Sequence, residues 1–561
     1  MKIFKLSLSL LFALFIFNQI FLPESISGEN KNGKNISLIE ESPLGDKYFE
    51  MNIFANTVLK DIEGMTKGFG IIVSPWVPTL FSNAYLNEVG ASGITLRINH
   101  DIRQIGNSFP STQIHKAFLN AGAIPMVAII GTASDNAYCQ PEGWQGETCV
   151  DFELSSIPKD LLVYKERVKQ IVRFYNQIGI FYFILWNEPN YVYGPNGEGN
   201  LRPVCRAPND CWWPTLEDFI DLTLTMAEAI QEVNLEDNVN NTIGVDATSS
   251  FFGTLPDRNG ISQDIPPAVF EALRQRGIEA YHHYHYYNPN PYNDNHQAIE
   301  NFITQMNATN PFFLGTNADE GSDGIINGDG INQVAYVLAK LADNVNLPLN
   351  RMGYFQLYSP VHEPGTINCG LIECTENMIS QAGIFRPIFW LSSLLHSTAG
   401  TLLLDDDLNE SDTVRAFAVR NAEGNAYRLY AVNFDESGQS ATIGITVNDL
   451  PKNVRSWKYT TYTIDAQNGN PALIESEIEG ALNPMIQSVK AEGGSHLDYL
   501  NAAWPTLEDL NHRSEAMPTV QEKIISGGKT RLSTQITIPY KGIKVICLEE
   551  NSNRKETSNR D

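Results

Sequence analysis

The chain has 561 residues, 42% of them hydrophobic, which suffices for a large core and for about two to four domains. Its formal net charge of −26 disfavours nucleic acids and anionic membranes as partners, because an acidic surface repels both. We attribute the acidity to solubility outside the cell.

The N-terminus has the pattern of an export signal. Lys2 precedes an apolar stretch over residues 6–17, and the small residues Ser25 and Ser27 stand where a cleavage site requires them. An uncleaved anchor is the alternative, but the apolar stretch is short for a membrane span. We therefore expect a signal peptide over residues 1–27, no stable membrane insertion after its cleavage, and a secreted or periplasmic location.

The cysteines also suit an exported chain. Six of the seven form close pairs in predicted loops, and this spacing predicts the local disulfides Cys139–Cys149, Cys205–Cys211 and Cys369–Cys374. Zinc binding is the weaker alternative, because no pair has C-x2-C spacing with a partner pair. Cys547 stands alone in an apolar run and is predicted to be a buried thiol.

Over residues 61–400, short β-rich runs alternate with amphipathic helical stretches. The predicted strands are 70–73, 93–98, 124–130, 181–185, 242–245, 278–287, 311–314 and 352–357, with helices between them such as 161–177, 216–233 and 331–343. Such alternation predicts a parallel sheet, and eight units fit a closed (β/α)8 TIM barrel. The C-terminal ends of the strands then form the active face, so polar residues there become functional candidates.

The pattern changes over residues 401–548. Predicted strands at 414–419, 427–433, 442–447, 457–464, 534–539 and 543–548 are separated by turn signals. They predict an all-β sandwich as an accessory domain, to which residues 28–60 could add a strand or two. The charged tail at 549–561 is predicted to be disordered.

The most informative motif is Trp186-Asn187-Glu188-Pro189-Asn190, directly after the fourth predicted strand. It places a carboxyl group at the barrel mouth beside an amide that can bind a sugar hydroxyl. Hydrolysis of a glycosidic bond requires one carboxyl group to protonate the leaving oxygen and a second to act at the anomeric carbon. The seventh strand leads into Asp319 and Glu320, which offer that second carboxylate on the same face. The alternative for Glu188, a helix-capping or loop role, is disfavoured by its five-residue context.

These features resemble clan A of the retaining glycoside hydrolases, and within it family 39, which includes β-xylosidases and α-L-iduronidase. The W-N-E-P motif, the segment 317–323 and the segment 462–465 carry the resemblance, which spans about residues 68–548 and is strong only at the motifs. It implies a double displacement without a cofactor, with Glu188 as acid/base and Glu320, rather than Asp319, as nucleophile. Asn187 is then expected to bind the sugar 2-hydroxyl.

The second and eighth strands depart from the family pattern. Arg97 stands where the resemblance places an arginine near the nucleophile, and a plain buried ion pair is its alternative role. The expected R-x-H becomes Arg97-Ile98-Asn99-His100, so the histidine comes one residue late and would face the wrong way. The eighth strand ends in Gln356-Leu357-Tyr358-Ser359 without a tryptophan, which leaves Tyr358 as the predicted substrate contact and a subsite unlike that of xylosidases.

The sixth predicted strand contains three histidines. Strand alternation puts His283 and His285 on one face and His282 on the other. We predict that His285, nearest the strand end, contacts the sugar, with His283 and Tyr287 as further contacts. Metal binding is a minority alternative, because only two histidines share a face and no carboxylate is nearby in sequence, so we expect no metal.

Trp213, in the loop after the fourth strand, is either a sugar-stacking platform or packing for the neighbouring cysteine loop. Together the motifs predict a secreted retaining glycoside hydrolase acting on a poly- or oligosaccharide. The alternatives are a transglycosidase, a catalytically silent glycan-binding protein on the same barrel, and a structural envelope protein whose β-sandwich is an interaction domain. The sequence carries no signal for the sugar, its linkage, its charge or the oligomeric state.

Overall fold

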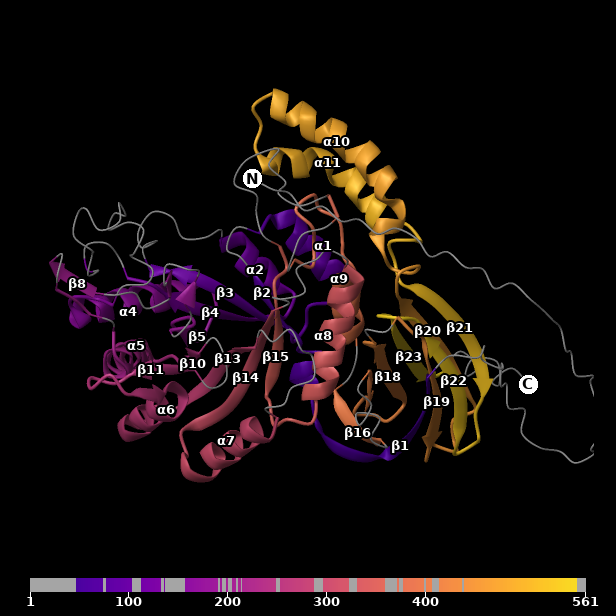
Figure 1. The fold of residues 1–561 in the computed structure, drawn as a ribbon, viewed down its shortest axis with the longest axis horizontal. Coiled ribbons are helices and arrows are strands. Elements are labelled where there is room, and N and C mark those ends of the chain that lie inside the picture. Colours follow the sequence, from indigo (N-terminus) through magenta and orange to yellow (C-terminus); the bar gives the residue numbers. More distant parts are fainter. Residues whose placement is uncertain are drawn as a thin grey trace, which may run out of the picture. The chain divides into compact units, whose positions relative to one another are not determined.

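The structure of the protein is a computed structural model. It describes residues 47–73, 77–102, 112–132, 136, 157–189, 192–193, 198–199, 204–207, 210–212, 214–248, 253–286, 296–321, 330–358, 371–372, 377–397, 400–405, 413–435 and 438–551. Within these residues the chain forms a closed barrel, a nine-stranded sheet and three two-stranded ribbons (Figure 1). No helix among them is long and apolar enough to cross a membrane.

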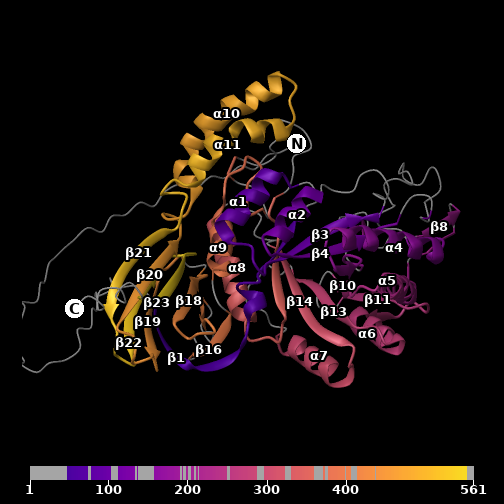
Figure 2. The ribbon, with the colours of Figure 1, turned by 180° about the vertical axis from the view of Figure 1, so that it is seen from behind.

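The barrel has eight parallel strands in chain order, which confirms the predicted TIM barrel. They are β2 (Gly70–Val73), β3 (Thr95–Asp101), β4 (Ile124–Ile130), β5 (Tyr182–Leu185), β10 (Thr242–Thr248), β13 (Ala280–Tyr286), β14 (Phe313–Gly321) and β15 (Arg351–Phe355). The helices that alternate with them are α1 (Thr79–Val89), α2 (Thr112–Asn120), α4 (Leu161–Gln177), α5 (Leu216–Asp237), α6 (Ile265–Arg276), α7 (His296–Thr309), α8 (Gly330–Asn344) and α9 (Pro387–His396). Both views show α5, α6 and α7 on the outside of the strands (Figures 1 and 2).

Local sequence signals fix where the barrel helices begin and end. At the start of α5, Thr215 and Asp218 form a reciprocal capping box, and Asn238 ends the helix in the left-handed region with φ 52°. At the start of α4, the side chain of Asp160 accepts hydrogen bonds from two backbone N–H groups of the first turn. These signals fix the start of α4 and both ends of α5.

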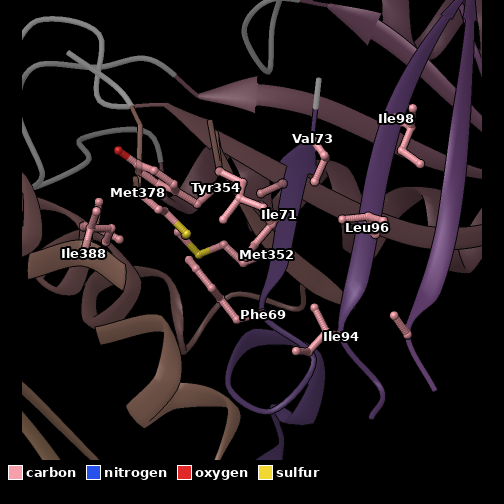
Figure 3. Packing of buried hydrophobic residues seen from close by; sticks show 14 of the residues in the cluster. Phe69, Ile71, Val73, Ile94, Leu96, Ile98, Met352, Tyr354, Met378 and Ile388 are labelled. Carbon is pink, nitrogen blue, oxygen red and sulfur yellow. The ribbon is translucent and has the colours of Figure 1, made fainter. Parts of the chain in front are cut away.

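Alternation along the barrel strands separates an outer core from an inner face. Ile71 and Val73 of β2 pack with Leu96 and Ile98 of β3 in the large core cluster between strands and helices (Figure 3). Arg97, between Leu96 and Ile98, is therefore directed to the inside of the barrel. A separate inner cluster is formed by Met126, Ala128, Tyr182 and Ile184. The inner face thus carries apolar side chains and also the charged side chain of Arg97, whose backbone pairs with that of Met126.

The second domain is a nine-stranded sheet in the order β21-β20-β23-β18-β17-β16-β1-β19-β22. Its strands are β1 (Lys47–Asp61), β16 (Thr401–Asp405), β17 (Val414–Arg420), β18 (Ala426–Asn433), β19 (Ala441–Asn448), β20 (Ser456–Ile464), β21 (Thr519–Ser526), β22 (Leu532–Ile538) and β23 (Ile543–Glu550). β1 precedes the barrel in sequence, yet it pairs antiparallel with β16 and parallel with β19. Cys547 lies in β23 as a buried free thiol, as predicted.

An α-helical hairpin interrupts this domain between β20 and β21, which the sequence analysis did not predict. It consists of α10 (Glu475–Ala491) and α11 (His496–Asn511), and each helix contains a proline that weakens the helical signal. The Tyr499 hydroxyl donates to the backbone oxygen of Ala382 at 3.0 Å. The ring centroids of Trp504 and Phe81 lie 5.9 Å apart. The hairpin therefore packs on the barrel, although its sequence lies inside the accessory domain.

Three short ribbons lie between barrel elements. They are β6 (Val192–Tyr193) with β7 (Glu198–Gly199), β8 (Val204–Ala207) with β9 (Asp210–Trp212), and β11 (Thr254–Pro256) with β12 (Ser262–Asp264). The backbone of β8 places Cys205 directly opposite Cys211 of β9. The other four cysteines with predicted partners lie outside the described residues, so all three disulfides stay predictions.

Candidate active site

The turn after β5 has an unusual backbone. Trp186 has φ 64° and Glu188 has φ 44°, a region that large side chains rarely adopt and that costs about 1–3 kcal/mol per residue. The surrounding structure holds this conformation, because Trp186 is buried and its N–H donates to the Ile129 oxygen at 3.0 Å. The turn buries the Glu188 side chain, leaving it 4% exposed, against residues of the inner barrel face.

Glu188 forms an ion pair with His285 of β13. His285 Nδ1 contacts Glu188 Oε1, and His285 Nε2 lies 2.9 Å from Asp246 Oδ2 of β10. Burial lowers the pKa of His285, but the carboxylates of Asp246 and Glu188 outweigh it and raise this pKa to about 10. The ring is therefore an imidazolium at neutral pH, with a carboxylate at each nitrogen.

Asp246 is fully buried and binds a second cation, Arg97 of β3. Arg97 Nη2 donates to Asp246 Oδ2 at 2.8 Å and to Asn187 Oδ1 at 2.7 Å. Burial alone would raise the pKa of Asp246, but His285 and Arg97 outweigh it and lower this pKa. Arg97 Nη1 also lies 2.6 Å from His285 Nε2, so a ring without a proton on Nε2 could accept from Arg97.

These four side chains balance in charge. Arg97 and His285 supply two positive charges, and Asp246 and Glu188 supply two negative charges, at 0% to 4% exposure. Removing one member would leave an uncompensated buried charge, which typically costs about 3–5 kcal/mol. We call these four side chains the charged cluster. Each member fixes the protonation state and the orientation of the others.

Three of these four residues were predicted from the sequence, and Asp246 was not. Arg97, His285 and Glu188 were site candidates, and the structure brings them together with Asn187. Asp246 directly follows the predicted strand at 242–245 and lies within the observed strand Thr242–Thr248, so the strand-end criterion that selected Glu188 also applied to it. It was overlooked because no motif surrounds it in sequence.

A second hydrogen-bonded group involves His283, the other inward-facing histidine of β13. His283 Nε2 lies 2.8 Å from the Tyr182 hydroxyl and 3.0 Å from Asn317 Nδ2. Gly244 of β10 allows this arrangement, because a Cβ there would approach the His283 ring to 2.7 Å. A contact between His283 and substrate stays a prediction.

Two other histidines face away from the barrel interior. His282 stacks on Tyr284 and contacts Phe270 of α6, and burial lowers its pKa to about 3. The alternation predicted for the sixth strand is therefore confirmed. His100, one residue late in the family pattern, contacts the Tyr175 hydroxyl of α4 through Nδ1 at 3.0 Å and does not join the charged cluster.

Glu320 lies on β14, where its backbone pairs with Tyr286 of β13 and Tyr354 of β15. β10 and β13 stand between β5 and β14 in the barrel, so the turn carrying Glu188 and the strand carrying Glu320 are three positions apart. The side chains of Asp319 and Glu320 lie outside the described part of the structure, as do all atoms of Tyr287 and Trp213.

Tyr358, the predicted contact after the eighth strand, is buried. Its hydroxyl lies 2.6 Å from His496 Nε2 of the α10–α11 hairpin, and its ring packs against Phe81. Among the described residues, no group of three or more histidine, cysteine or acidic side chains could hold a metal ion.

Searches of protein-family models and of curated proteins found no match. Solved structures do match. The GH39 enzyme from Xanthomonas axonopodis pv. citri has TM-score 0.56 at 12% identity, over 92% of this chain and 100% of that chain. The chain has the fold of the family 39 glycosidases. A GH39 β-xylosidase from Caulobacter crescentus has TM-score 0.54 at 13% identity, over 89% and 99% of the two chains. A bacterial orthologue of human α-L-iduronidase has TM-score 0.56 at 12% identity, over 90% and 84%. At such identities the likeness concerns the fold, and it confirms the resemblance at that level.

Proposed function

We propose that this protein is a secreted or periplasmic retaining glycoside hydrolase that cleaves O-glycosidic bonds of a poly- or oligosaccharide. The observation that carries the proposal is the buried Glu188 on a strained turn after β5, in contact with His285 and beside Asn187. Strain of this kind is retained where function requires it. The shared fold with family 39 glycosidases supports the same conclusion.

The proposed reaction has two steps. In the first, a carboxylate oxygen of Glu320 bonds to the anomeric carbon while the bond to the leaving oxygen breaks, and Glu188 passes to that oxygen the proton held between it and His285. In the second, Glu188 takes a proton from water as the water oxygen replaces Glu320 at the anomeric carbon. The two displacements retain the anomeric configuration, and the reaction needs no cofactor.

Asn187 is suited to bind the sugar beside this centre. Its Oδ1 accepts from Arg97, so its Nδ2 remains the end of the amide that can donate to a hydroxyl. A hydrogen bond to the 2-hydroxyl strengthens as positive charge develops on the ring in the transition state. Arg97 thereby fixes which end of the amide faces the sugar.

The test is release of reducing ends from a panel of polysaccharides and aryl glycosides. Glu188→Gln and Glu320→Gln should release little, whereas the control Glu166→Gln, a 64% exposed carboxylate on α4, should match the wild type. Nuclear magnetic resonance of the first product should show the anomer of the substrate, and the opposite anomer would refute the double displacement.

Other outcomes favour the alternatives. Products lengthened by an added acceptor sugar would indicate a transglycosidase. Binding without release, equal in wild type and both variants, would indicate a catalytically silent glycan-binding protein. Turnover of no glycan with retained binding to cell-surface material would favour a structural envelope role.

A further inference from the structure

We propose that Asp246 is the positioning residue of this site, and that its carboxylate orients Glu188 through His285 and Asn187 through Arg97. The inference rests on the proposed function and deepens it, because it assigns a role to a strand-end residue that the two-carboxylate mechanism does not use.

The geometry converges on one oxygen atom. Asp246 Oδ2 lies 2.8 Å from Arg97 Nη2 and 2.9 Å from His285 Nε2. Each of these cations then contacts a residue of the W-N-E-P turn: Arg97 contacts Asn187, and His285 contacts Glu188. One carboxylate therefore anchors both halves of the predicted acid/base segment.

The strand order makes this arrangement possible. β10 pairs with β5 on one side and with β13 on the other, and its backbone pairs Asp246 with His283. Asp246 therefore stands between the turn that carries Glu188 and the strand that carries His285. A role in stability alone would not require these partners, since a buried ion pair is often no more stable than an apolar replacement.

Asp246 also determines which nitrogen of His285 faces Glu188 as a proton acceptor. Asp246 accepts a hydrogen bond from Nε2–H of His285, so the neutral form of this ring keeps its proton on Nε2. Nδ1, which contacts Glu188, is then the nitrogen that exchanges a proton with Glu188. The His285–Glu188 pair then carries one transferable proton. That proton goes to the leaving oxygen in the first step, and water returns one to the pair in the second.

The described charged groups around His285 come from three barrel elements. Asp246 faces it from β10, Glu188 from the turn after β5, and Arg97 from β3. On a further element, β14, the backbone pairs Asp319 with His285. Of the three described contacts, only Asp246 and Glu188 favour the protonated ring, so loss of Asp246 should both weaken proton binding and release Nε2 to accept from Arg97.

The experiment compares Asp246→Asn with wild type and with Asp343→Asn. Asp343 is a matched control, because it lies 3.0 Å from His296 Nε2 and 3.7 Å from Arg415 Nε, and neither of these partners belongs to the charged cluster. The first readout is the ¹⁵N chemical shifts of His285 across pH, assigned by their loss in His285→Gln. The second is kcat and KM on the substrate found in the panel.

We expect Asp246→Asn to lower the titration midpoint of His285 by more than about one pH unit and to move the neutral-ring proton from Nε2 to Nδ1. We expect kcat to fall by about 100-fold or more, since a wrong tautomer disables proton transfer and a displaced Asn187 loses a hydrogen bond that is strongest in the transition state. KM should change less than kcat, because both losses act mainly on the transition state. Asp343→Asn should leave both readouts at wild-type values.

The proposal is overturned if Asp246→Asn leaves the His285 midpoint and tautomer unchanged, or if Asp343→Asn lowers kcat equally. If Asp246→Asn does not fold, the test is the pH titration of His285 in the wild type. A titration midpoint near the ordinary value of 6.5 then overturns the proposal. If the wild type cleaves no glycan, the proposed function fails, and the His285 spectra still show whether Asp246 sets the state of the ring.

Discussion

The protonation of His285 should make the stability of this protein fall with alkaline pH. The folded ring has a pKa of about 10, against an ordinary value of 6.5. Below 6.5 both folded and unfolded chains bind the proton, so the stabilisation is fully present. Between these two values the folded chain keeps a proton that the unfolded chain has lost, and the free energy of unfolding falls by about 1.36 kcal/mol per pH unit.

The interval from 6.5 to about 10 corresponds to a loss of up to about 5 kcal/mol. The ring is fully buried, so solvent does not screen its contacts with Asp246 and Glu188. Urea unfolding from pH 6 to pH 10 measures the change. Lysines and tyrosines also titrate near the upper end, so the relevant quantity is the difference between wild type and His285→Gln at each pH.

That difference should shrink steadily as pH rises from 6.5 to about 10. The variant is expected to be less stable at neutral pH, since it leaves Asp246 and Glu188 with one fewer cation. A difference that stays constant over this range would refute the reasoning, because it would mean that folding does not change the proton affinity of His285.

Two further predictions concern packing. Gly244→Ala should lower the free energy of unfolding by about 1–3 kcal/mol, because its Cβ would approach the His283 ring to 2.7 Å. Thermal unfolding measures this, and Gly480→Ala, where nothing lies within 4 Å, should not destabilise; equal losses would contradict the steric argument. Tyr358→Phe removes the 2.6 Å contact with His496 and should cost about 1 kcal/mol. Hydrogen exchange should then become faster in the α10–α11 hairpin, and unchanged exchange there would show that other contacts hold the hairpin.

The barrel was predictable because its signals are local. Each buried strand is a short apolar run that ends in polar residues, as 242–245 before Asp246 illustrates. The alternation that put His283 and His285 on one face of β13 is likewise a property of a single strand. Eight such runs in chain order left few alternatives to a closed barrel.

The charged cluster could not be assembled from sequence in the same way. Its contacts cross from β3 to β10 and from β13 to the turn after β5, so they exist only once strands that are distant in sequence have assembled. The positive φ values of Trp186 and Glu188 were also hidden, because tertiary contacts impose them against local preference. The hairpin was missed because Pro484 and Pro505 lie inside its helices.

The pairing of β1 with β16 and β19 constrains how the chain can assemble. β1 leaves the ribosome before any barrel strand, yet both of its partners are translated after the whole barrel. Its apolar residues Met51, Ile53 and Ala55 therefore cannot complete their packing in the sheet until synthesis passes Asn448. A version that ends after α9 would expose them permanently, as an unpaired strand prone to aggregation. Isolating the barrel thus requires removal of β1 as well as the C-terminal strands.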